Sequence, residues 1–192
     1  MPDYILEEDK AKKEKVPKMS VMGVGYQRTG GLDFTVLLRD YLAKRFTEAH
    51  HPKTPIYSNP RAMSKLLVEG ERVKKHFSFN PEVLAQVETL HEGKDFRVTI
   101  PREEFEPLCE ELLNKVTEPV ADALKMAGIT ANDLDFFILM GAGTRMPAVQ
   151  QRLQALIPGK ELNKFLNTDE AIAMGAVFEA AHQSKGFRYL GD

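Results

Sequence analysis

The chain of 192 residues contains no tryptophan, a single cysteine and no long apolar run. One thiol cannot close a disulfide within the chain, so an internal disulfide framework is excluded. The longest apolar runs, such as Leu134–Met140 with Asp135 in it, are far shorter than the roughly 20 residues that span a bilayer. Acidic and lysine-rich residues follow Met1 where a signal peptide would carry an apolar region. We therefore expect neither a transmembrane segment nor a signal peptide in this sequence.

The charge of the chain is nearly balanced. The sequence has 26 basic and 28 acidic residues, which leaves a net charge of −2. This balance gives no electrostatic reason to expect DNA, RNA or an anionic membrane as a partner. An apolar content of 43% in a chain of this length suits one globular domain or two small subdomains with a buried core.

The hydrophobic periodicity predicts an α/β fold. We expect strands at 19–26, 83–90, 96–100 and 134–140, and helices at 34–50, 60–77, 101–116, 118–127, 147–157 and 168–184. Pro119 is expected to kink or divide the long helical stretch that Gly128 closes. Cys109 falls at an apolar helical position and is predicted to be a packing residue.

The charge pattern suggests three regions. Glu7–Lys15 carries four acidic residues and four lysines and cannot bury apolar surface, which is typical of a solvated tail, a hairpin tip or a disordered lead-in. We therefore expect residues 1–17 to form a flexible charged lead-in. Residues 18–31 and 110–192 are expected to form a core lobe. Residues 32–109, with helices and a hairpin, are expected to form a smaller inserted α+β subdomain.

The turn Gly141–Pro147 connects a predicted strand to a predicted helix. Its two glycines permit a tight turn and close approach of a ligand, and the proline-initiated helix directs free N–H groups at the loop, as phosphate binding requires. The sequence contains no Walker loop, and a dinucleotide fingerprint would need glycine in place of Met146. The turn alone leaves two interpretations open: a phosphate-binding turn, or a plain connection that needs small residues.

A second polar cluster lies on the helix predicted at 60–77 and at its end. Glu71, Lys74, Lys75 and Ser78 stand at positions i, i+3, i+4 and i+7, so all four are expected on one helix face. The pattern suits either a solvated charged face or a surface that binds ribose hydroxyls and an adenine base.

Other catalytic and metal-binding patterns are absent from the sequence. His50-His51 has no spaced cysteine or aspartate partner, and neither Gly-x-Ser-x-Gly nor His-Glu-x-x-His occurs. The pairs Glu103-Glu104 and Glu110-Glu111 are expected to be solvated on a helix surface. We therefore assign no catalytic and no metal-ligating residue.

Several segments together resemble the 70-kDa heat-shock proteins, in order and over most of the chain. Arg61–Ser78 is similar to the adenosine-contacting helix of that family, and Leu139–Pro147 to its second adenosine motif. Phe96–Leu113 and Thr168–Ala176 are similar to its helix after the hairpin and to its closing segment. Within the family, Gly23–Gly31 resembles the large endoplasmic-reticulum branch of 170-kDa glucose-regulated, hypoxia-up-regulated chaperones. The resemblance implies an actin/ribonuclease-H-like ATPase lobe, with a mixed sheet and helices, that carries the α+β insert.

The resemblance also implies a role for each residue of the two clusters. Glu71 and Lys74 are expected to bind the ribose hydroxyls, and Ser78 the edge of the adenine. Arg145 and Lys75 are expected to cover the two faces of the adenine, although many family members have arginine where Lys75 stands.

The resemblance also implies which residues lie near the phosphates of the nucleotide. Gly141, Ala142 and Gly143 are expected to approach the α- and β-phosphates, although the family usually has Gly-Gly-Ser/Ala here. Asp169 would support the turn, and a double glycine would lie near the nucleotide. The expected nucleotide contacts are Gly30, Gly31, Glu71, Lys74, Lys75, Ser78, Gly141, Ala142, Gly143, Arg145, Met146 and Asp169.

The resemblance therefore implies the ATP- or ADP-binding lobe of a chaperone ATPase that assists protein folding under stress. The two glycine-rich phosphate hairpins of the family are not found in this sequence, so we expect a fragment that does not hydrolyse ATP alone and that needs a first ATPase lobe for Mg²⁺.

Expected partners are nucleotide, that first lobe, and an exchange factor or co-chaperone on the insert. The implied compartment is the endoplasmic-reticulum lumen, with the cytoplasm as the alternative. A module of the same fold that has lost nucleotide binding, and another enzyme of the actin and sugar-kinase superfamily, are the competing interpretations.

Overall fold

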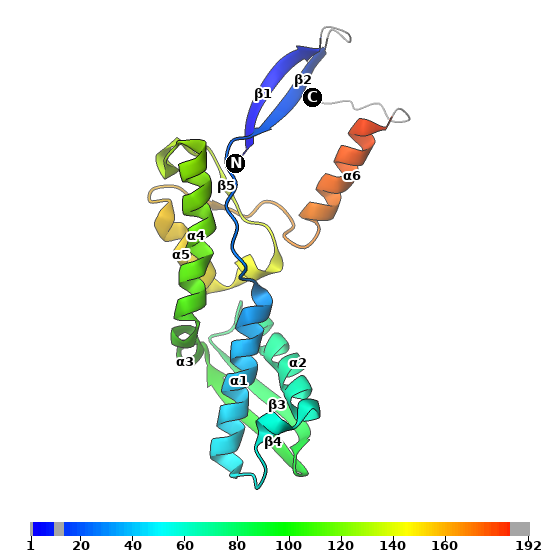
Figure 1. Ribbon diagram of the computed structural model, residues 1–192, viewed down its shortest axis with the longest axis vertical. Helices are drawn as coiled ribbons and strands as arrows, with labels where there is room; N and C mark the ends of the chain where they lie inside the picture. Colours follow the sequence, from blue (N-terminus) through cyan, green and yellow to red (C-terminus); the bar gives the residue numbers. More distant parts are fainter. Residues whose placement is uncertain (1, 10–13, 185–192) are drawn as a thin grey trace.

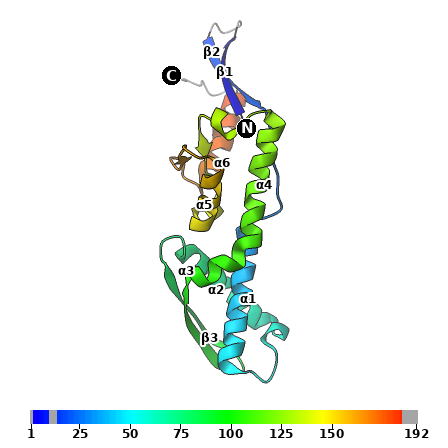
Figure 2. The same ribbon diagram turned by 90° about the vertical axis from the view of Figure 1, so that its left-hand side faces the viewer.

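The computed structural model describes residues 2–9 and 14–184, arranged as two units along the long axis of the molecule (Figures 1 and 2). The strands are β1 (Pro2–Asp9), β2 (Glu14–Val21), β3 (Glu82–His91), β4 (Lys94–Pro101), β5 (Phe137–Ile138) and β6 (Leu162–Asn163). The α-helices are α1 (Gly31–His50), α2 (Pro60–His76), α3 (Arg102–Phe105), α4 (Glu110–Ala127), α5 (Pro147–Leu156) and α6 (Ala171–Gln183). Short 3-10 helices lie at η1 (Ile56–Ser58), η2 (Glu106–Cys109), η3 (Ala131–Asp133) and η4 (Ala142–Arg145).

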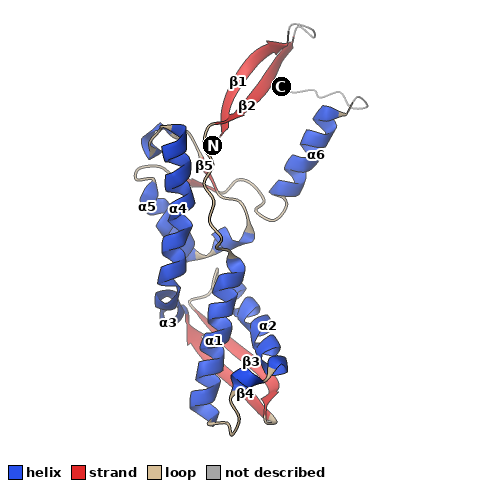
Figure 3. Cartoon of the chain, viewed as in Figure 1, coloured by secondary structure: helices blue, strands red, loops and turns tan. Residues whose placement is uncertain are grey.

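The strands of the described residues form three separate pairs, shown in red in Figure 3. β1 pairs with β2 and β3 with β4, both antiparallel, whereas β5 and β6 are parallel. The expected mixture of helices and strands is therefore confirmed. The parallel and antiparallel strands nevertheless belong to different pairs, and no single mixed sheet joins them among these residues.

The lower unit holds α1, α2 and the β3–β4 hairpin, with both helices on one face of the hairpin (Figure 1). Leu38, Leu42 and Phe46 recur at helical spacing along α1 and are all completely buried. Phe46 meets Phe96 of β4 edge to face, with ring centroids 5.6 Å apart. The predicted helices and hairpin of this region are confirmed. The apolar residues at helical spacing on the helices and those that alternate along the strands are buried in one shared core.

The start of α2 also follows the sequence prediction. The Asn59 side chain accepts a hydrogen bond of 3.1 Å from the Ala62 N–H, and Pro60 occupies the first helical position. A capping side chain satisfies one of the free N–H groups of the first turn, and proline lacks one of them from the outset. The cap and the proline therefore fix the amino-terminal end of α2, the helix that carries the polar cluster.

The long helix differs from the prediction at Pro119. The structure keeps α4 intact through Pro119, and the interruption falls earlier, where η2 contains Pro107. A proline in a helix removes one backbone hydrogen bond, and α4 packs against α5. Gly128 ends α4 in the left-handed conformation with φ of 69°, as predicted.

The described residues of the amino-terminal region form two paired strands, as the hairpin interpretation of Glu7–Lys15 allows. Pro2–Asp9 pairs with Glu14–Val21, and the register places Glu8 opposite Lys15. The strand predicted at 19–26 ends at Val21, and the one predicted at 134–140 is reduced to the two residues of β5.

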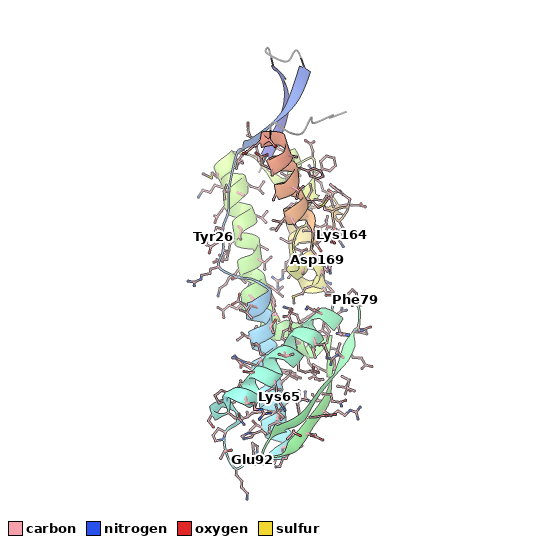
Figure 4. All side chains as sticks on the ribbon, turned by 90° about the vertical axis from the view of Figure 1, so that its right-hand side faces the viewer. Tyr26, Lys65, Phe79, Glu92, Lys164 and Asp169 are labelled. Atoms are coloured by element: carbon pink, nitrogen blue, oxygen red, sulfur yellow. The ribbon has the colours of Figure 1, made fainter. Side chains whose placement is uncertain are left out.

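The segment between β2 and α1 runs along α4, where Tyr26 is labelled in Figure 4. A Cβ atom at Gly23 would lie 2.2 Å from the Ala123 carbonyl oxygen, and one at Gly25 would lie 1.8 Å from that of Pro119. Only glycine permits this approach of two backbones. The segment thus leads directly to the Gly30-Gly31 turn at the start of α1. No helix of the described residues has the length and apolar character needed to cross a membrane.

Candidate functional site

The turn after β5 is shaped by its backbone. Leu139 N–H donates to the Asn163 carbonyl at 3.1 Å and so extends the parallel pairing of β5 and β6 by one bond. Gly141 then adopts a φ of 90°, which favours glycine, and its N–H donates to the Thr168 carbonyl at 3.1 Å. The turn is therefore fixed between the end of β5 and the residues that precede α6.

The backbone of this turn is open to a ligand. Ala142 and Gly143 are exposed, and a Cβ atom placed on Gly141 or Gly143 would have nothing within 4 Å. Helix α5 starts at Pro147 with Met146 as its N-cap residue. A phosphate could thus approach bare backbone beside a helix amino terminus, which is the arrangement that favours anions.

Arg145 and Asp169 join the turn to the segment ahead of α6. Arg145 Nη2 donates to Asp169 Oδ2 at 2.7 Å, and both side chains are about half exposed. The Asp169 N–H donates to the Asn167 side chain at 3.1 Å, which fixes the backbone next to this ion pair. The guanidinium is thereby held at the surface by Asp169.

A second network lies in the lower unit, where α2 meets the start of α1. Lys74 Nζ contacts Glu71 Oε2 at 2.6 Å, Thr35 Oγ1 at 2.8 Å and the Gly31 carbonyl at 2.9 Å. Thr35 Oγ1 in turn donates to Glu71 Oε2 at 2.6 Å. Burial raises the pKa of Glu71, but the hydrogen bonds from Lys74 and Thr35 and the charge of Lys74 outweigh it, and the net pKa is lowered.

The remaining predicted residues of this cluster lie at its edge. Lys75 is exposed, and its ammonium lies 3.5 Å from Glu71 Oε1. Ser78 lies beyond the end of α2, in the turn after His76, so the expectation that one helix carries all four side chains is wrong. The Ser78 N–H donates to the Lys75 carbonyl at 3.2 Å, because the chain tightens as the helix ends.

The two clusters belong to different units, the lower unit and an upper unit that holds α4, α5, α6, β5 and β6, which follow each other along the long axis of the molecule. Figure 4 labels Phe79, just past Ser78, at the end of the lower unit that faces Asp169 of the upper unit. In Figure 1 the same end of α2 lies below the segment that connects β5 to α5. Gly30 and Gly31, at the start of α1, connect the lower network to the segment that runs along α4.

Thr35 is a member of this network that the sequence analysis did not identify. It is 1% exposed and bonds three other residues of the cluster. A threonine in an apolar stretch of a helix gives no sequence signal for such a role. Only the packing of α1 against α2 shows that its hydroxyl faces Glu71 and Lys74.

The surroundings of the single cysteine are fully described. Cys109 is 1% exposed, and burial raises the pKa of its thiol to about 12, which confirms it as a packing residue. Among the described residues, no group of three or more His, Cys, Asp or Glu side chains could hold a metal ion.

The described residues combine helices and strands, consistent with an α/β ATPase-like fold. The sequence profile of the Hsp70 protein family matches residues 19–188, and the chain belongs to this family. The expected family is therefore confirmed.

The relatives also confirm the expected branch. The chain is 44% identical over 173 residues to hypoxia up-regulated protein 1 of Gallus gallus, which covers 90% of this chain and 17% of that protein. The protein of the same name from Xenopus tropicalis is also 44% identical over 173 residues, or 90% of this chain and 27% of that protein. The Homo sapiens protein is 42% identical over 175 residues, or 90% and 18%. The chain thus spans 17 to 27% of the length of these relatives.

Proposed function

We propose that this chain is the adenine-nucleotide-binding lobe of the ATPase domain of a heat-shock-type chaperone that assists protein folding. The observation that carries the proposal is the pairing of an open glycine turn at 141–143 with a buried polar network around Glu71, on ends of the two units that face each other. Family membership supports it, because the matched region includes both clusters. The lobe would have the actin/ribonuclease-H-like arrangement with residues 32–109 as its insert.

Each of the predicted contact residues would bind a different part of the nucleotide. The backbone of Gly141–Gly143 would receive the phosphates, and Arg145 would cover one face of the adenine from its ion pair with Asp169. Lys75 would cover the other face, and Ser78 would bond the adenine edge. Glu71 would bind the ribose, with Gly30-Gly31 close to the nucleotide.

The same proposal includes partners and a compartment. A first ATPase lobe of the parent protein would close on the nucleotide and supply the Mg²⁺ ligands. The exposed apolar side chains of α6, such as Ile172, Val177 and Phe178, support contact between the upper unit and the rest of the parent protein.

An exchange factor or co-chaperone would bind the insert. A groove of about 1040 Å³ between α2 and β3, lined by charged side chains such as Lys65, Arg72 and Glu88, supports this site. The branch favours the endoplasmic-reticulum lumen as the compartment.

Calorimetric titration with ADP tests the proposal on the 192-residue chain. We expect weak, saturable binding at millimolar or lower concentration, because one lobe supplies only part of the contacts. Binding should be lost in Arg145→Ala and kept in Arg152→Ala, which removes an arginine paired with Glu110 in the α4–α5 contact. Absence of ADP and ATP binding at millimolar concentration would contradict the proposal.

A second candidate is an interaction module of the same fold that does not bind nucleotide. The hydrogen bonding of Lys74 favours this candidate, because its ammonium already donates to three partners within the protein. In that case neither ADP nor ATP should raise the melting temperature, whereas the lobe proposed above should be stabilised by ligand binding to the folded state.

A further inference from the structure

We propose that three side chains of α2, those of Lys65, Glu69 and Arg72, cover the free edge of β3 and so prevent it from pairing with β3 of a second copy of this chain. An open strand edge is a ready template for pairing with another chain, and proteins cover such edges in several ways. The inference goes beyond the proposed nucleotide site and does not depend on it.

The strand β3 has one edge that no other strand covers. Among the described residues it pairs only with β4. The Arg102 N–H donates to the Pro81 carbonyl at 2.7 Å, and the bonded positions alternate along an antiparallel pair. The backbone groups of Leu84, Gln86 and Glu88 therefore point away from β4 and toward the open edge.

Side chains of α2 form hydrogen bonds with these three positions of the edge. The bonds run from Arg72 Nη2 to the Leu84 carbonyl at 2.6 Å, from the Gln86 N–H to Glu69 Oε1 at 2.8 Å, and from Lys65 Nζ to the Glu88 carbonyl at 2.8 Å. Each outward-facing position from 84 to 88 thus has a partner on the helix. We call the three side chains the edge-covering residues; Lys65 is labelled on α2 in Figure 4.

The spacing of the edge-covering residues fits the spacing of the strand. Lys65, Glu69 and Arg72 stand at i, i+4 and i+7, which places them on one face of α2. They span about 10 Å of helix, and the stretch from Leu84 to Glu88 spans about 14 Å of strand. Side chains as long as those of lysine and arginine bridge this difference, so α2 runs antiparallel to β3 and covers its edge.

Glu69 and Arg72 act together at the centre of the edge. Arg72 donates to both carboxylate oxygens of Glu69, from Nε at 2.9 Å and from Nη2 at 2.6 Å. Such a bidentate pair has a fixed geometry, and Glu69 is only 8% exposed. The pair offers one acceptor and one donor to the strand, as the peptide groups of a neighbouring strand would.

The residues of β3 favour pairing when this cover is removed. Val83–Val87 contains no charged residue, proline or glycine, which is typical of segments that associate as strands. Leu84 and Val68 are exposed apolar residues, and both line the groove of about 1040 Å³ beside the edge. An uncovered edge would therefore have room for the same stretch of a second copy, related to it by a two-fold axis.

Light scattering coupled to size-exclusion chromatography tests the inference on the full chain. The unaltered chain should keep the mass of a monomer as its concentration rises, whereas Glu69→Ala/Arg72→Ala should double its mass. Adding Gln86→Pro to the double variant should restore the monomer mass, because proline has no N–H for an incoming strand. The matched control is Arg45→Ala/Glu104→Ala, which removes an ion pair of 2.9 Å elsewhere in the lower unit and should remain monomeric.

Amide hydrogen exchange separates the uncovered edge from a loss of folding. In the dilute double variant, exchange should become several-fold faster at Gln86 and stay slow at Ala85 and Val87, whose N–H groups face β4. If protection is lost at these two positions as well, Arg72→Ala takes the place of the double variant, because it leaves Glu69 on the Gln86 N–H. It should still associate more strongly than the unaltered chain.

Three results would overturn the inference. The first is a folded double variant, or a folded Arg72→Ala variant in its place, that remains monomeric at every concentration. The second is association that persists after Gln86→Pro, because it would use another surface. The third is an unaltered chain that already dimerises and that Gln86→Pro makes monomeric, because the edge would then be open despite the edge-covering residues.

Discussion

Arg145 Nη2 and Asp169 Oδ2 lie 2.7 Å apart and join the turn ahead of α5 to the segment ahead of α6. Both side chains are about half exposed, so the ion pair contributes less than about 1 kcal/mol to the free energy of unfolding. An ion pair of such small value to the fold is better explained as a means of holding the guanidinium at the surface.

Arg145→Ala should therefore affect binding much more than stability. We expect the denaturation midpoint to shift by less than about 1 kcal/mol in unfolding free energy, while ADP binding falls below detection. Urea denaturation and calorimetry measure the two effects on the same samples. A large loss of stability with unchanged ADP affinity would show that Arg145 is a structural residue.

Glu92 gives a prediction about pH. Its carboxylate accepts from the Thr54 N–H at 2.8 Å, the Lys53 N–H at 3.1 Å and the Thr54 hydroxyl at 2.9 Å. These bonds, led by that from the Thr54 N–H, lower the pKa of Glu92 from 4.5 to about 2. Because the folded-state pKa is the lower one, the stabilisation is present above pH 4.5 and is lost as the pH falls toward about 2.

Glu92→Gln should accordingly lower the melting temperature at neutral pH, and the difference from the unaltered chain should shrink steadily below pH 4.5. Thermal denaturation across this range is the measurement. Glu88→Gln is the matched control, since its carboxylate makes no hydrogen bond to any described residue. A difference that does not depend on pH would contradict this account of the turn.

His91 supports the loop that leads into α2 and is predicted to be necessary for stability. It is 6% exposed, and its Nδ1 lies 3.0 Å from Asn59 Nδ2 while its Nε2 lies 2.9 Å from the Thr54 carbonyl. Because Asn59 uses its oxygen to cap Ala62, its amide nitrogen donates to Nδ1, and Nε2 therefore carries the hydrogen.

His91→Leu should lower the free energy of unfolding by about 1–3 kcal/mol for each polar group left buried without a partner. The exposed His76→Leu should change it by less than about 0.5 kcal/mol. Chemical denaturation of both variants is the measurement, and equal small effects would contradict the hydrogen bonding described for His91.

Gly25 tests the close contact between the segment after β2 and helix α4. A Cβ atom at this position would lie 1.8 Å from the Pro119 carbonyl oxygen, whereas one at Gly30 would have nothing within 4 Å. Gly25→Ala should destabilise the fold by about 1–3 kcal/mol, as overpacking usually does. Gly30→Ala should have a clearly smaller effect in the same thermal denaturation, and equal effects would show that the segment does not pack on α4 as described.

The lower unit could be predicted well because its elements have strong and separate periodicities. The apolar residues of α1 recur at helical spacing, Asn59-Pro60 marks the start of α2, and the alternation from Phe96 to Ile100 defines β4. Each of these local patterns agrees with the burial in the tertiary structure, so local preference and tertiary packing favour the same elements.

The differences arise where tertiary contacts override a local signal. Pro119 favours a helix break, but α4 continues because α5 packs against it. The charged sequence around Glu8 has no apolar pattern, although its backbone pairs as a strand. Thr35 could not be identified as part of the site, since its role depends on Glu71, which lies 36 positions further along the chain.

Titration of the isotope-labelled chain with ADP, followed by amide NMR, tests the central claim most directly. The account predicts concentration-dependent shifts at both Gly141–Arg145 and Glu71–Ser78, with saturation at the same nucleotide concentration, because one ligand would contact both clusters. Shifts confined to one cluster, or no shift at millimolar ADP, would contradict it.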